Sequence, residues 1–187
     1  MGVPTSGRFE AAFTQHYARV QRVLVGLLGA DEADDAAQEV FLRLYHSHLL
    51  EQEDTSVGAW LYRVALTTAY NRLRGRRRQA THLNRAGQLA QADIVGAESA
   101  LNPAQAAEAA EEADLVRRAL AALSPTHRNV LVLRHAGLSY AEVAAAAGVQ
   151  PGSVGTLLAR GEAHLRAQYL RLAGEMPARS DQPGGRP

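Results

Sequence analysis

Apolar side chains recur at helical spacing through the N-terminal part of the chain. The first run predicts one amphipathic helix that ends near Gly29. A second helix is expected to follow, with Asp31 as its cap and carboxylates in a first turn that the macrodipole favours. A third helix is predicted from Val57 to about Arg78, with one apolar side. The apolar positions of the three helices are Phe9, Phe13, Tyr17, Val20, Leu24, Leu27 and Leu28, then Val40, Phe41, Leu44 and Tyr45, then Leu61, Ala65, Ala69 and Leu73.

The segment from Gln79 to about Leu101 loses this periodicity and is rich in Ala, Gln and Gly. It has few large apolar residues to anchor it, so we interpret it as a flexible linker between two domains. Asn102 followed by Pro103 is a helix cap with a first-turn proline. It predicts a helix that begins acidic and ends basic near Leu123.

Two further helix starts follow in the C-terminal part. Ser124 with Pro125 begins one helix, and Ser139 with Glu142 has the spacing of a capping box for the next. After about Gly174 the chain becomes rich in Pro and Gly, so a disordered tail is expected.

These patterns predict an all-α protein of two small helical domains joined by a flexible linker. Within its 187 residues, 47% hydrophobic side chains suffice for such cores, and 5% aromatic residues with abundant alanine favour helices over sheets. The expected division is a disordered N-terminus at 1–8, an N-terminal domain at 9–78, a linker at 79–101, a C-terminal domain at 102–172 and a disordered tail at 173–187.

Composition narrows the function classes. The chain contains no cysteine, which excludes disulfides and thiolate metal sites, and we expect no cofactor. It shows no secretory signal and no segment apolar enough to cross a bilayer, so we expect a cytoplasmic protein without stable membrane insertion. All 20 basic residues are arginine and the formal net charge is only +1, so their clustering carries the information.

The stretch from Tyr140 to Leu157 fits the steric pattern of a DNA-binding helix-turn-helix. Gly148 stands where the turn needs a positive φ, and Ala144 is small enough to let two helices approach. The second helix, from about Gly152 to Tyr169, would lie in the major groove. The expected core residues are Val143, Ala147, Val149, Val154 and Leu157, and the expected DNA-facing residues are Gln150, Ser153, Gly155, Thr156 and Arg160. An Ala-rich helical hairpin joined through glycine would also fit this pattern.

The third helix carries a second candidate surface on the side opposite its apolar face. Aromatic and arginine side chains alternate there every three or four residues, and more arginines follow. Aromatic rings stack on unpaired bases and arginines neutralise phosphates, so this face suits partly melted DNA. The candidates are Trp60, Arg63, Thr67, Tyr70, Asn71, Arg74, Arg76 and Arg77. Alternatively, Trp60 and Tyr70 belong to the core and the arginines form a solvated helix end.

The second helix is acidic where the third is basic, so we do not expect it to contact nucleic acid. Its mixed face is a candidate docking surface for a protein partner, although helix capping explains the first carboxylates equally well. The residues of this face are Asp35, Gln38, Glu39, Leu42 and Arg43.

At this point the residues resemble a known family, the ECF (extracytoplasmic function) sigma factors of bacterial RNA polymerase. The run from Asp34 to Tyr45 resembles the family's segment that binds the β′ clamp helices. The runs Trp60 to Ala65 and Asn71 to Arg74 resemble its helix that recognises and melts the minus-ten promoter element. The polar loop at 47–56 corresponds to the loop that captures a flipped base, and 120–165 is similar to the domain that reads the minus-thirty-five element.

The resemblance implies a non-enzymatic subunit that directs core RNA polymerase to promoters. The implied partners are the β′ clamp helices and the β flap of the polymerase, promoter DNA and an anti-sigma factor. Where the family carries basic residues in its recognition helix, this chain has Gly155, Leu157 and Glu162. We therefore expect a weak or unusual grip on the upstream element.

Two other functions fit parts of the sequence. A stand-alone regulator would use the helix-turn-helix on an operator and would bind DNA tightly without polymerase. An enzyme would have to use groups such as His46, His48 and Glu51. Because His46 and His48 lie two residues apart, they would not share a helix face, and no further motif completes a site.

Overall fold

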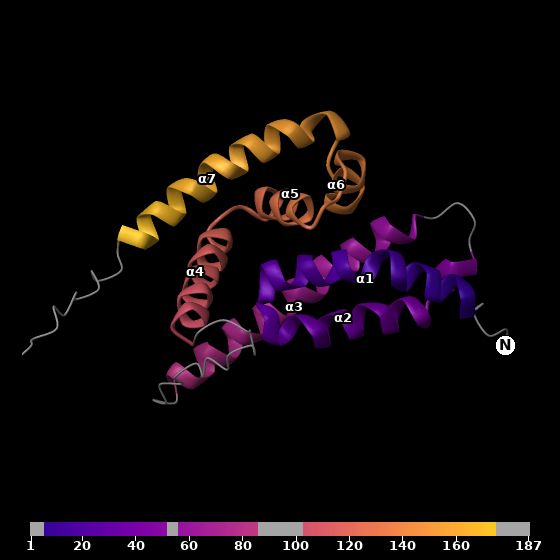
Figure 1. The fold of residues 1–187 in the computed structure, drawn as a ribbon, viewed down its shortest axis with the longest axis horizontal. Helices are drawn as coiled ribbons and strands as arrows, with labels where there is room; N and C mark the ends of the chain where they lie inside the picture. Colours follow the sequence, from indigo (N-terminus) through magenta and orange to yellow (C-terminus); the bar gives the residue numbers. More distant parts are fainter. Residues whose placement is uncertain (1–5, 52–55, 86–102, 175–187) are drawn as a thin grey trace, which may run out of the picture.

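The computed structural model describes residues 6–51, 56–85 and 103–174, and these are almost entirely helical (Figure 1). No strand occurs among them, which confirms the all-α class. The elements are α1 Ser6–Leu28, α2 Ala30–Tyr45, a 3-10 turn at His48–Glu51, α3 Val57–Arg85, α4 Pro103–Ala121, α5 Pro125–His135, α6 Tyr140–Ala147, a 3-10 turn at Pro151–Ser153 and α7 Val154–Gly174.

Helices α1, α2 and α3 form an antiparallel bundle, the N-terminal module. Its centre is apolar because each helix turns its periodic side inward, with Val20, Val40 and Leu61 fully buried. The chain passes from α1 to α2 through Gly29, whose φ of 97° is readily adopted only by glycine. Gly29 is thus the N-cap of α2. The prediction of Asp31 as the cap was wrong, since Asp31 already lies in the first helical turn.

Helices α4 to α7 form the C-terminal module and contain the expected helix-turn-helix. Ser124 caps α5 by accepting a hydrogen bond from the His127 amide, and Ser139 and Glu142 make the predicted capping box of α6. Gly148 ends α6 in the left-handed conformation with φ 69°, as the turn requires. Of the expected core residues, Val143 and Val154 are buried, whereas Ala147, Val149 and Leu157 are half-buried and pack against the core. The small Ala144, expected to let the helices approach, is buried, and Leu158 is a further buried residue of α7 that was not expected.

A buried arginine holds the turn between α4 and α5, a feature that the sequence analysis did not identify. Arg128 is 8% exposed and donates to the carbonyl oxygens of Leu120 at 2.8 Å, Ala121 at 2.7 Å and Leu123 at 2.9 Å. Leu120 and Ala121 lie at the end of α4, where carbonyls form the negative end of the helix dipole, and Leu123 lies in the turn that follows. These oxygens and the dipole stabilise the positive charge of the buried guanidinium.

Several expected boundaries differ from the structure. Helix α1 begins at Ser6, inside the segment expected to be disordered, and α7 continues to Gly174. Helix α3 continues to Arg85, seven residues into the expected linker, because arginine, alanine and glutamine are good helix formers even without an apolar stripe. The remainder of the expected linker, the Asn102 cap and most of the expected tail lie outside the described residues.

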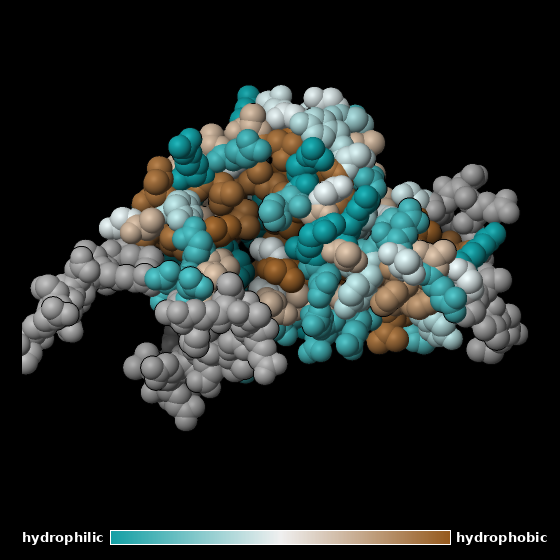
Figure 2. All heavy atoms as spheres, viewed as in Figure 1, coloured by the Kyte–Doolittle hydropathy of each residue, from teal (hydrophilic) through white to brown (hydrophobic). Residues whose placement is uncertain are grey.

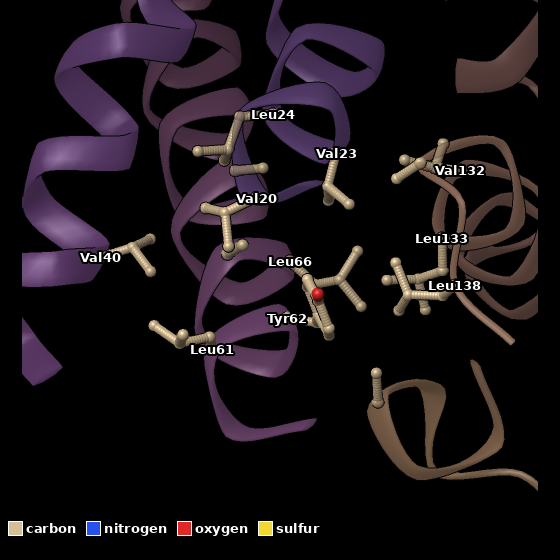
Figure 3. Close-up of a cluster of buried hydrophobic side chains, with 14 of the residues drawn as sticks. Val20, Val23, Leu24, Val40, Leu61, Tyr62, Leu66, Val132, Leu133 and Leu138 are labelled. Carbon is tan, nitrogen blue, oxygen red and sulfur yellow. The ribbon is translucent and has the colours of Figure 1, made fainter. Parts of the chain in front are cut away.

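The two modules are packed against each other instead of standing apart. Figure 1 shows α5 lying along α1, and α6 contacts α3. Side chains of both modules join one continuous core, in which Val23 and Leu66 face Val132 and Leu138 (Figure 3). The arrangement of the modules is therefore set by buried apolar surface as well as by the connecting chain.

Alanine substitutions at two glycines test the backbone conformations described here. Gly148 is left-handed at the end of α6, whereas Gly75 is helical within α3. At Gly148 an added methyl has space but φ is positive, so Gly148→Ala should lower the free energy of unfolding by about 1 kcal/mol. At Gly75, inside α3 with nothing near, Gly75→Ala should raise it by up to about 1 kcal/mol. Urea unfolding followed by circular dichroism measures both. Equal effects at the two positions would contradict the left-handed turn.

Candidate nucleic-acid and polymerase interfaces

The stripe on α3 is only partly exposed. Arg63, Thr67, Asn71, Arg74, Arg76 and Arg77 reach the surface. Trp60 and Tyr70 are half-buried and pack against the core, so the expectation of a uniformly exposed stripe was wrong for its two aromatic residues. The physical reason is their size, since large rings at the edge of a small bundle cover apolar neighbours.

Two residues of this stripe contact the C-terminal module. Arg63 donates through Nη2 to the Ala145 carbonyl oxygen at 2.8 Å, and the Tyr70 hydroxyl donates to Oδ1 of Asn129. The Arg128 guanidinium lies 5.6 Å from the centre of the Tyr70 ring, within cation–π range. Burial raises the pKa of Tyr70, which keeps its hydroxyl protonated and able to donate. The minus-ten candidates are thus partly covered from the opposite module.

Other arginines of α3 hold α2. Arg76 pairs with Glu32 at 2.7 Å and Arg72 pairs with Glu39 at 3.3 Å. These ion pairs lie near the surface and contribute at most about 1 kcal/mol each to stability. Replacing Glu32 by a phosphate as the partner of Arg76 would therefore require little free energy. Arg72 was not among the predicted site residues, and its contact with Glu39 links the basic helix to the mixed face of α2.

The mixed face of α2 is largely exposed. Asp35, Gln38, Leu42 and Arg43 lie at the surface, with 58% of Leu42 exposed, and Glu39 is half-buried between Arg43 and Arg72. The sequence analysis missed the aromatic cluster beside this face. Phe13 packs on Phe41 with ring centres 4.9 Å apart, yet Phe13 and Tyr45 remain 39% and 45% exposed. Exposed apolar surface next to a charged rim is typical of a protein-docking site.

The recognition face of the helix-turn-helix is fully open. Gln150, Ser153, Gly155, Thr156 and Arg160 are all exposed around the start of α7, which packs on α4, α5 and α6. A Cβ at position 155 would lie 3.8 Å from the Tyr140 ring, an ordinary contact, so the fold itself does not require this glycine. All five candidates are therefore accessible to solvent, and their role in binding DNA stays a prediction.

A polar network connects α1 of the N-terminal module to α6 of the C-terminal module. The sequence analysis did not predict it, because no sequence motif corresponds to it. Nδ1 of buried His16 lies 3.0 Å from the Tyr62 hydroxyl, and Arg19 pairs with Glu142 at 3.3 Å. Burial, helped by the Arg19 charge and opposed by Glu142, lowers the pKa of His16. Hydrogen bonds from Ser139, foremost its backbone amide, lower the pKa of Glu142, although burial opposes them. Only the tertiary structure brings α1 and α6 together, which explains why spacing gave no signal.

His46 and His48, the residues considered for an enzyme, are exposed at the end of α2. Within 6–51, 56–85 and 103–174 no three histidine or acidic side chains gather as metal ligands. The same residues contain no helix that combines the length and apolar character needed to cross a membrane.

Family models match both modules in order. Sigma-70 region 2 matches residues 12–79 and sigma-70 region 4 matches residues 113–165. The chain is 31% identical over 174 residues to the RNA polymerase sigma factor CarQ of Myxococcus xanthus, which covers 90% of each chain. This chain belongs to the ECF sigma factors. The ECF RNA polymerase sigma factor SigE of Mycolicibacterium smegmatis is 33% identical over 163 residues, covering 86% of this chain and 61% of that one.

Solved sigma factor structures share the fold. The sigma factor RpoE of Bartonella quintana, crystallised with the anti-sigma factor NepR, aligns with a TM-score of 0.58 at 20% identity over 86% of this chain and 95% of that one. CnrH in complex with the cytosolic domain of CnrY aligns with a TM-score of 0.57 at 23% identity, over 90% and 89%. The helix-turn-helix thus lies in sigma region 4, and the basic helix α3 lies in sigma region 2.

The His16 contact makes a pH prediction. Because the fold lowers the pKa of His16 from 6.5, the unfolded chain binds its proton more readily just below that value. The free energy of unfolding should be highest above pH 6.5 and should fall as the pH drops through and below it.

His16→Gln, which keeps a hydrogen-bonding group for Tyr62, should lose less stability than the unaltered protein between about pH 7.5 and about pH 5.5. Urea midpoints at the two pH values measure the difference. Glu142 does not mask it, because its pKa is lowered from 4.5 and its contribution is lost only in stronger acid. An equal loss in both proteins would show that His16 titrates normally.

Proposed function

We propose that this sigma factor divides promoter recognition between its two modules at the residues described above. What supports the proposal most is that one chain carries two separate candidate DNA faces, one in sigma region 2 and one in sigma region 4. The first combines arginines with aromatic rings and suits separated strands; the second is the start of a recognition helix and suits an intact major groove.

In the N-terminal module, Arg63, Arg74, Arg76 and Arg77 would neutralise phosphates of the minus-ten element. Trp60 and Tyr70 would stack on unpaired bases, while Thr67 and Asn71 would donate to base edges or phosphates. Each stacked base contributes about 1–3 kcal/mol, enough to offset the cost of unpairing when several act together.

In the C-terminal module, the minus-thirty-five element would meet Gln150, Ser153, Gly155, Thr156 and Arg160. Arg160 carries the only positive charge among these five residues, so few phosphates are neutralised at this face. We therefore propose that upstream binding is weak and that base contacts and shape carry more of the selectivity than charge.

Polymerase contacts are proposed for two surfaces, the mixed face of α2 and an apolar region of the C-terminal module. The mixed face Asp35, Gln38, Glu39, Leu42 and Arg43 would dock on the β′ clamp helices. The β flap would dock on the C-terminal module, where Figure 2 shows apolar side chains gathered along α7 and where 61% of Leu170 is exposed.

An anti-sigma factor is a further proposed partner. The sigma factor RpoE was crystallised with the anti-sigma factor NepR, and CnrH was solved in complex with the cytosolic domain of CnrY, which supports this proposal. We propose no reaction and no cofactor for the chain itself, and we place its action in the cytoplasm, where polymerase and promoters meet.

Run-off transcription on sheared genomic DNA of the native host tests this function. Core polymerase with the protein should give discrete start sites, and polymerase or protein alone should give none. Tight, specific binding of the protein alone to DNA, with no effect on transcription, would favour the stand-alone regulator instead.

Alanine substitutions of Arg74 and Arg160 should affect transcription initiation in different ways. Arg74→Ala should slow promoter opening about tenfold on all promoters and reduce the salt dependence, because a general phosphate contact is lost. Arg160→Ala should change the preference among upstream sequences while leaving opening on a pre-melted template unchanged. Arg166→Ala, an exposed position further along α7, is the control. Opening rates measured by fluorescence on matched promoters distinguish these outcomes; identical defects would contradict the division of labour.

A further inference from the structure

Two histidines of the C-terminal module lie side by side, and neither belongs to the proposed DNA- or polymerase-binding residues. His127 is in the first turn of α5 and His164 is on α7, and their ring centres are 5.2 Å apart with the ring planes at 74°. His127 is half-buried and His164 is exposed. The pair therefore lies at the edge of the contact between the two helices and is open to solvent on the His164 side.

The two rings meet because α5 and α7, which lie beside each other in Figure 1, approach closely at a glycine. Gly161 of α7 is buried, and a Cβ added there would lie 3.2 Å from Cγ of Leu131 and 3.4 Å from Cβ of His127. A side chain at this position would push the helices apart, so the glycine lets α7 pass close to the start of α5. His164 follows Gly161 by three residues, which places it on the same side of α7, next to the His127 ring.

The separation of the two rings matches the geometry of a shared metal ion. In a tetrahedral site with Zn–N distances of about 2.0–2.1 Å, two ligating imidazole rings have their centres about 5 Å apart. The ring centres of His127 and His164 are 5.2 Å apart, in agreement with this distance. Because His164 is exposed, its ring can turn to direct a nitrogen toward a shared ion without disturbing the core.

The residue that caps α5 also orients the His127 ring. Oγ of Ser124 lies 3.1 Å from Nδ1 of His127. Nδ1 is therefore engaged, and Nε2 is the ring nitrogen that can bind an ion while Nδ1–H donates to the serine oxygen. Metal-binding histidines ordinarily donate their second ring nitrogen to an acceptor in this way, which fixes the tautomer and the orientation of the ring.

We propose that His127 and His164 form a site for a zinc ion, bound by Nε2 of His127 and one ring nitrogen of His164, with water completing the coordination. Imidazole nitrogens favour zinc, copper and nickel over magnesium and calcium. Two protein ligands hold an ion less tightly than the four of a structural zinc site, so the ion exchanges with the solution. The ion links α5 to α7 and takes no part in the promoter contacts proposed above.

Zinc titration of the 187-residue chain, prepared without an affinity tag, tests the site. Competition with a chromophoric zinc indicator should show one zinc ion bound per chain, and magnesium at the same concentration should not displace it. His127→Gln and His164→Gln should each lower the zinc affinity about tenfold or more, because each removes one of the two protein ligands.

The matched control is His135→Gln, which removes an exposed imidazole from the last turn of the same helix and should leave the zinc affinity unchanged. Circular dichroism checks that the variants fold. Because His164 is exposed, His164→Gln decides the result even if His127→Gln is destabilised. Failure of the natural chain to bind one zinc ion, or stoichiometric binding that survives in His164→Gln, would overturn the proposal and leave the two rings as an aromatic contact only.

Substitutions at Ser124 test which nitrogen of His127 binds the ion. Ser124→Asp keeps a good helix cap and gives Nδ1–H a charged acceptor, so the zinc affinity should rise about threefold or more. Ser124→Thr keeps a hydroxyl as cap and acceptor, so it should change the zinc affinity little. Equal zinc affinities in these two variants would contradict binding through Nε2.

The bound ion should also stabilise the folded chain. Zinc at about 100 times its dissociation constant should raise the Tm of the natural chain by about 5 °C or more, because it binds the folded state in preference to the unfolded state. Thermal unfolding followed by circular dichroism measures this shift, which should be lost in His164→Gln and kept in His135→Gln. A Tm that zinc leaves unchanged would contradict a link between α5 and α7. These measurements use neither polymerase nor DNA, so their failure and the failure of the proposed function are distinguishable.

Discussion

The apolar contact between the two modules determines much of what this structure presents to solvent. Each module is small, and neither can enclose all of its large apolar side chains alone. Val23 and Leu66 of the N-terminal module become buried against Val132 and Leu138 of the C-terminal module, so one core extends through both. Removing apolar surface from water favours the packing of the two modules but does not fix their relative orientation. The polar contacts at the edge of the interface, such as the hydrogen bond from Arg63 to the Ala145 carbonyl, fix that orientation.

Those edge contacts give the two proposed DNA faces different exposure. The carbonyl end of α6 accepts a hydrogen bond from Arg63, and Asn129 accepts one from Tyr70, whereas the proposed contact residues around the start of α7 are exposed in the part of the chain that the structure describes. A helix end and a phosphate both offer oxygen atoms with negative charge to a guanidinium. A surface proposed to bind phosphates, such as that of Arg63, is therefore also able to bind one of the protein's own helix ends.

The arginines show how little the net charge says about their use. Arg128 holds the end of α4, Arg72 and Arg76 attach α3 to α2, and Arg63 reaches across to α6. The formal net charge of +1 results from nearly equal numbers of opposite charges. Since ion pairs near the surface are weak, Arg72 and Arg76 can exchange an internal partner for an external one, whereas Arg128 is buried at the end of α4.

The sequence alone determined the helices, the caps at Ser124 and Ser139, the glycine at the helix-turn-helix and the family, because these depend on local spacing and on short-range backbone geometry. It did not reveal that Trp60 and Tyr70 pack inward, that His16 and Arg19 join a network with Tyr62 and Glu142, or that α6 lies on α3. Only the tertiary structure decided these features, because they depend on which apolar faces meet, and helical periodicity shows that a face is buried without showing what buries it.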